Sequence, residues 1–102
     1  MAEPSSRQLE KHIRKHAVNS SNVAFTKHAQ QRMRERKINM PMIFDVLRNG
    51  VLRMTPEPDL KYPGVKCRME RFVAGVQAAV VVYVEYPAPE LVVVTVIDVN
   101  ED

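Results

Sequence analysis

The chain has no tryptophan, only one cysteine and few aromatic side chains. Aromatic residues make up 6% of its 102 residues, whereas methionine occurs six times. We therefore expect a core built from valine, isoleucine, leucine and adaptable thioether side chains. The single cysteine, Cys67, cannot form an internal disulfide, and this suits a reducing compartment.

Long apolar runs are also lacking. No stretch reaches the roughly 20 apolar residues that a membrane-spanning helix needs. Charged residues occupy the N-terminal stretch where a signal peptide has its apolar region. We therefore expect a cytoplasmic protein with no membrane partner.

The two halves of the chain differ in charge. Residues 1–50 hold ten Lys and Arg against four Asp and Glu, a net charge of +6, whereas residues 51–102 hold five against eight, a net charge of −3. The hydrophobic content of 45% and charged content of 26% are those of one globular domain. The basic half could meet a phosphate backbone or an acidic protein, or it could be an ordinary solvated face.

Residues 1–22 are predicted to form a tail and an accessory helix, followed by a domain at residues 23–102. Ser5 and Gln8 have the spacing of a capping box, which predicts a helix start. Apolar residues then recur every four positions, at Leu9, Ile13 and Ala17. The sequence leaves open whether this helix packs on the domain, swaps onto a partner or stays mobile.

Two histidines of this helix, His12 and His16, are one turn apart and could in principle bind a metal ion. No Cys, Asp or third His lies nearby at ligand spacing. We therefore predict neither a metal ion nor a cofactor.

The most basic stretch is Thr26–Lys37, which contains one histidine, three arginines, two lysines and one glutamate. Its straight-chain residues favour a helix, and Thr26 is a suitable N-cap. An apolar seam runs along one side of this helix, at Phe25, Ala29 and Met33. Positions i, i+3 and i+4 are neighbours on a helix, and this places a separate polar stripe at His28, Arg32, Glu35 and Arg36.

The rest of the chain predicts one more helix and then strands. The second helix starts at Asn39 or Met40 and ends near Asn49, before Gly50. Strands are expected at 51–54, 65–73, 76–86 and 91–99, with a tight turn at Ala74-Gly75. Residues 56–64 are expected to form a loop, because their three prolines cannot all donate to a ladder. The predicted fold class is α+β, with N-terminal helices on one face of a four-stranded antiparallel sheet.

Strand phase separates the two faces of this sheet. Cys67 shares its phase with Val65 and Met69, which predicts a core position rather than a nucleophile. The 91–99 strand is apolar on both faces except at Thr95 and Asp98. Either this strand is central, or its second face meets another chain, so we predict a homodimer through the apolar sheet face.

The order of elements and the motif of the basic helix resemble the RelE and BrnT superfamily of small bacterial toxins, over about residues 24–99. The closest likeness is to an uncharacterised domain family within that superfamily. The matching pattern is His28, Arg32, Glu35-Arg36, Ile38 and Asn49-Gly50. The resemblance implies a RelE-like fold, action on RNA and a cognate antitoxin as partner.

Metal-free cleavage of RNA needs a base, an acid and cations that stabilise the developing phosphorane charge. We assign His28 and Glu35 as candidate catalytic residues, because imidazole titrates near neutrality and an ionised carboxylate can accept a proton. The candidates for binding phosphate or a base are Arg32, Arg36, Lys66, Arg68, Arg71 and Tyr83. The alternative is that the helix stripe forms salt links that tie the helix to the rest of the domain.

Two functions follow. The first is a toxin-like RNA-binding protein or metal-independent endoribonuclease. The second is a non-catalytic protein-interaction module of an accessory, immunity-like or regulatory kind. The acidic C-terminus, which lacks a late Arg, His or Tyr, favours the second function, and the resemblance favours the first.

Overall fold

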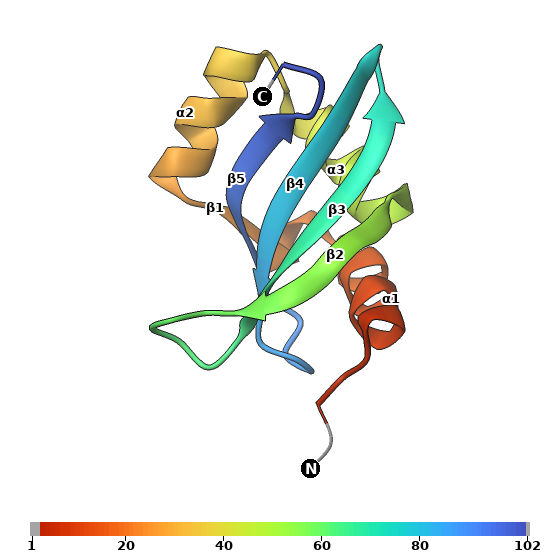
Figure 1. The fold of residues 1–102 in the computed structure, drawn as a ribbon, viewed down its shortest axis with the longest axis vertical. Helices are drawn as coiled ribbons and strands as arrows, with labels where there is room; N and C mark the ends of the chain where they lie inside the picture. The colour runs from red at the N-terminus through yellow and green to blue at the C-terminus, as the bar shows by residue number, and fades with distance from the viewer. Residues whose placement is uncertain (1–2, 102) are drawn as a thin grey trace.

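The computed structural model describes residues 3–101 as three helices on a five-stranded sheet (Figure 1). The elements are α1 (Ser6–His16), the 3₁₀ turn η1 (Ser20–Asn22), β1 (Val23–Phe25), α2 (Lys27–Arg36), α3 (Met40–Asn49), β2 (Val51–Pro58), β3 (Val65–Val73), β4 (Val76–Val84) and β5 (Leu91–Asp98). The strand order is β1-β5-β4-β3-β2. Within the described residues, none of the helices has the length and apolar character needed to cross a bilayer.

The α+β class is correct, but the prediction of a four-stranded, wholly antiparallel sheet is wrong. Strands β2 to β5 pair antiparallel as expected. A fifth strand, β1, pairs parallel to β5, with Val23 opposite Leu91 and Phe25 opposite Val93. Three residues are too few to give a readable alternation, and their pairing partner lies almost 70 residues further along the chain.

Strand β2 continues to Pro58, so the prediction of a loop from residue 56 is also wrong in its first part. β2 is the last strand of the sheet, and an edge strand tolerates prolines because one side of it has no ladder partner. The pairing with β3 is irregular between Arg53 and Glu57, and Met54 adopts a positive φ of 63°. This irregularity accommodates Pro56 within the strand.

The predicted helix starts and the predicted hairpin turn are confirmed. Ser5 and Gln8 form the capping box of α1, Thr26 accepts from the backbone N–H of Ala29, and Asn39 accepts from that of Met42. In the turn between β3 and β4, Ala74 and Gly75 both have positive φ, 50° and 79°. Two such residues match the right-handed twist of the flanking strands.

All three helices contribute to one core on one face of the sheet. Cys67 and Met69 of β3 are fully buried in this core, as the strand phase predicts. Burial raises the pKa of the Cys67 thiol to about 11, so little thiolate forms at neutral pH. Among the described elements, no helix lies over the opposite face of the sheet (Figure 1). We call this second face the open face.

Helix α1 packs against α3 and β2, which answers the question that the sequence left open. Its apolar stripe, Leu9, Ile13 and Ala17, is at most 2% exposed. Two polar side chains fasten it further: Arg14 donates to the carbonyl of Gly50 at 2.6 and 2.9 Å, and Glu10 accepts from the N–H of Leu52 at 2.7 Å. α1 therefore satisfies backbone groups where α3 passes into the edge strand.

His12 of α1 is 7% exposed, and its Nε2 lies 2.8 Å from the carbonyl oxygen of Ala88, to which it donates. Burial, opposed by this hydrogen bond and reinforced by His16 and Lys15, lowers the pKa of His12 below its ordinary value of 6.5. The folded protein therefore binds fewer protons than the unfolded chain as the pH falls through 6.5, and folding loses stability there.

We expect the free energy of unfolding to fall more steeply between pH 7.5 and 5 in the native protein than in His12→Gln, whose amide keeps a donor for Ala88. Urea unfolding at several pH values measures this difference. Identical pH profiles for the two proteins would show that His12 does not titrate differently on folding.

Candidate nucleic-acid interface

Helix α2 presents two different polar sides. Its seam residues Ala29 and Met33 face the core. Residues two positions apart on a helix are separated by about 200°. The stripe predicted from the sequence, His28, Arg32, Glu35 and Arg36, therefore lies on the side away from Gln30, Arg34 and Lys37. We call the first set the His28 stripe; it lies on the side of α2 turned away from α3.

Glu35 organises the His28 stripe. Its carboxylate accepts from Arg32 at 2.7 Å and from the Gln31 amide at 2.9 Å, and Arg36 lies 3.5 Å from it. The amide of Gln31, and after it the guanidinium of Arg32, lower the pKa of Glu35. A carboxylate with a lowered pKa and occupied oxygens is a weak base. Its contacts are those of a residue that positions two guanidinium groups.

His28 is exposed, and Arg32 Nε donates to its Nε2 across 3.5 Å. This distance is at the outer limit for a hydrogen bond, so the ring is held only weakly. In this contact Nε2 of His28 is the acceptor. Of the two predicted catalytic residues, His28 is the one whose proton-accepting atoms are exposed and only weakly held.

Lys66, Arg68 and Tyr83 lie on the open face, where Lys66 of β3 is directly opposite Tyr83 of β4 and Arg68 is two residues further along β3. Arg68 pairs with Glu70 at 2.8 Å. The Tyr83 hydroxyl accepts from the N–H of Gly64 and donates to Glu85, and burial followed by this carboxylate raises its pKa. β4 separates β3 from β5, so roughly 10 Å lies between the backbones of β3 and β5. Lys66 and Arg68 share the open face with Tyr83, but β4 separates them from β5, the strand that α2 contacts.

Arg71 is turned the other way. Its guanidinium lies 3.2 Å from Asp45 of α3 and donates to the carbonyl of Asn49 at 3.5 Å. It follows the phase of the core face near the end of β3, so it meets α3 rather than Lys66 and Arg68. The structure therefore does not bring Arg71 together with the other predicted binding residues.

A family model described as Domain of unknown function (DUF4258) matches residues 25–98. The chain belongs to this family. No curated protein and no solved structure matched the chain.

All eight predicted site residues lie inside the DUF4258 region, from His28 to Tyr83. Helix α1 precedes that region, although it shares the same core.

Among the described residues no group of three or more His, Cys, Asp or Glu side chains is arranged to hold a metal ion. His12 and His16 lie with ring centroids 4.4 Å apart.

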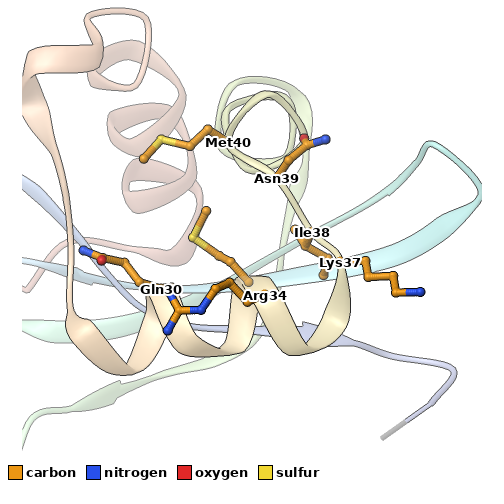
Figure 2. Close-up of a pocket in the computed structure, with 7 residues that line it drawn as sticks. Gln30, Arg34, Lys37, Ile38, Asn39 and Met40 are labelled. Carbon is orange, nitrogen blue, oxygen red and sulfur yellow. The ribbon is translucent and has the colours of Figure 1, made fainter.

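The DUF4258 region also forms a groove that the sequence did not predict (Figure 2). None of the four residues of the His28 stripe lines this groove. Two cavities, of about 540 and 730 Å³, are lined by other described residues. The first, which we call the α2–α3 groove, is lined by Gln30, Met33, Arg34, Lys37, Ile38, Asn39 and Met40. The i, i+4, i+7 spacing of Gln30, Arg34 and Lys37 marks its α2 side in the sequence, but its α3 side depends on the turn between the helices.

Proposed function

We propose that this DUF4258 protein binds RNA through the His28 stripe, with Arg32 and Arg36 contacting phosphate groups. The observation that carries the proposal is the Arg32–Glu35–Arg36 cluster, in which one exposed carboxylate holds two half-buried guanidinium groups on the side of α2 away from α3. A guanidinium pairs with phosphate oxygens in a bidentate way. Fixing its orientation beforehand lowers the entropy lost on binding.

The charge around α2 supports the same proposal. From Lys27 to its C-cap Lys37, the helix has five Lys and Arg side chains and one Glu, a net charge of +4. Only its seam faces the core, so most of this charge is displayed to solvent. A surface of this kind attracts a polyanion over a distance set by the ionic strength.

The resemblance to RelE and BrnT toxins gives the reason for choosing RNA. Strands β2 to β5 with helices on one face are the arrangement that this resemblance implies, and the parallel strand β1 is an addition to it. Lys66 and Arg68 add basic side chains on the open face, separate from the His28 stripe.

Cleavage of RNA would depend on His28 rather than Glu35. A neutral imidazole can remove the 2′-hydroxyl proton, and Arg32 beside it can stabilise charge on the phosphate. Glu35, which is tied to Gln31 and Arg32, would hold Arg32 in place.

We expect Arg32→Gln to weaken binding of a fluorescein-labelled single-stranded RNA roughly tenfold, because a charge-assisted contact to phosphate is worth about 1.5 kcal/mol. The slope of log K against log salt should fall by about one. Fluorescence anisotropy at several salt concentrations measures both quantities. Denaturing gels of the RNA after incubation with the native protein and with His28→Ala show whether the RNA is cleaved and whether cleavage requires His28.

The matched control is Arg7→Gln on α1, which removes the same charge from an exposed helix position outside the stripe. Its RNA affinity should stay within about twofold of the native protein. Equal weakening by Arg7→Gln and Arg32→Gln would mean that only net charge matters, and the stripe would not be the site.

A second candidate function is protein interaction. The observation that favours it is the apolar floor of the α2–α3 groove.

A further inference from the structure

The α2–α3 groove has an apolar floor. Ile38 forms its buried base and is 1% exposed, whereas Met40, at the first turn of α3, is 46% exposed. Met33 lines the groove from α2 and also packs against the core. Exposed thioethers beside a helix junction form a surface that can adapt to an incoming apolar side chain.

The rim of the groove is basic. Arg34 and Lys37 are exposed and line it from α2 (Figure 2). Lys37 adopts the left-handed conformation, with φ of 54°, and its N–H is bonded to the carbonyls of Met33 and Arg34. Among the described residues that line the groove, none is acidic. The groove is therefore complementary to a ligand that is apolar at its centre and acidic at its edges.

An aliphatic side chain fits this floor better than a nucleobase does. The edges of a base carry donors and acceptors, which must find partners when they are buried. The side chains of Met33, Ile38 and Met40 offer none. The described lining also contains no aromatic ring on which a base could stack.

We propose that the α2–α3 groove docks an acidic amphipathic helix of a protein partner. Its aliphatic residues contact Met33, Ile38 and Met40, and its carboxylates face Arg34 and Lys37. Apolar anchors one helical turn apart are the usual way in which such a helix occupies a groove. The groove is on the opposite side of α2 from the His28 stripe, so this proposal does not depend on the binding of RNA.

The probe is a fluorescein-labelled helical peptide of about 16 residues, with leucine at i, i+3, i+4 and i+7 and glutamate at the other positions. We expect saturable binding to the full chain, and at least a tenfold weaker affinity for Met40→Glu, which places a carboxylate in the groove. The same substitution suits the first turn of a helix, so α3 should stay folded. Arg34→Gln should weaken binding roughly threefold.

The matched control for Met40→Glu is Met54→Glu, which adds the same charge at a methionine that is 68% exposed in β2. It should bind the peptide with native affinity. A peptide of the same composition with its leucines dispersed around the helix should not bind, and neither should one with lysine in place of glutamate. Amide NMR shifts on titration should map to residues 30–42.

Four results would each overturn the proposal. The first three are no binding of the acidic peptide, equal affinity of the peptide for Met40→Glu and Met54→Glu, and binding of the peptide with dispersed leucines as tightly as the amphipathic one. The fourth is that a single-stranded RNA, titrated under the same conditions, shifts the amide signals of the groove residues while the peptide does not. The RNA proposal is tested separately, by the RNA affinity of Arg32→Gln, so the failure of one proposal is distinguishable from the failure of the other.

Discussion

Replacing Ile13 with alanine is expected to lower the free energy of unfolding by about 3 kcal/mol. Ile13 is fully buried in the core that α1 shares with α3 and the sheet. Removing its side chain leaves a cavity, and the surrounding α1–α3 contacts can close only part of it. Urea unfolding followed by circular dichroism measures the change, provided that the transition is two-state.

Val18→Ala is the matched control, because Val18 lies just beyond the same helix and is 69% exposed. It should change stability by no more than about 0.5 kcal/mol. Comparing Ile13→Ala with Val18→Ala also tests whether α1 is part of the folded domain, since α1 precedes the DUF4258 match at residues 25–98. A small effect of Ile13→Ala would mean that residues 25–98 hold together without α1.

Replacing Gly50 with alanine is expected to destabilise the protein by about 3 kcal/mol, which lowers the melting temperature by on the order of 15 °C. A Cβ at this position would lie 2.4 Å from the Val46 carbonyl oxygen and 2.7 Å from that of Glu70. Both atoms belong to the backbone, so neither can move aside without shifting α3 or β3. The Gly50 carbonyl also accepts both hydrogen bonds from Arg14.

The control for this experiment is Gly75→Asn, measured by the same thermal melt. Gly75 has a positive φ of 79°, and nothing lies within 4 Å of its Cβ position. Asparagine tolerates this conformation in a hairpin turn, so the change should stay within about 0.5 kcal/mol. An equally small loss of stability in Gly50→Ala would mean that α3 and β3 can move apart at little cost to make room for the added methyl group.

The stability tests and the functional tests are linked through α3. Gly50 ends α3, and Asn39 begins it by capping the N–H of Met42. The groove lies against the first residues of the same helix. A change at Gly50 that tilts α3 should therefore also weaken binding of the acidic peptide. Ile13→Ala should lower stability and leave the affinity for the peptide unchanged.

The sequence by itself determined the features that depend on neighbours within a few residues. Thr26 and Asn39 cap their helices with hydrogen bonds to residues three positions ahead. The i, i+3 and i+4 spacing alone brought Arg32 and Glu35 together. Ala74-Gly75 forms the predicted tight turn, in which Gly75 adopts a positive φ without a steric penalty. These interactions close within one turn of chain, so a short window contains all the information they need.

Only the tertiary structure decided the features that join distant segments. The parallel pairing of β1 with β5 and the edge position of β2, which permits Pro56 within a strand, depend on where the whole sheet ends. Arg71 meets Asp45 because α3 happens to cross the end of β3. The α2–α3 groove exists because the turn at Lys37 sets Met40 beside the α2 side chains. Contacts between distant segments are selected by packing of the whole core, which no local pattern of residues encodes.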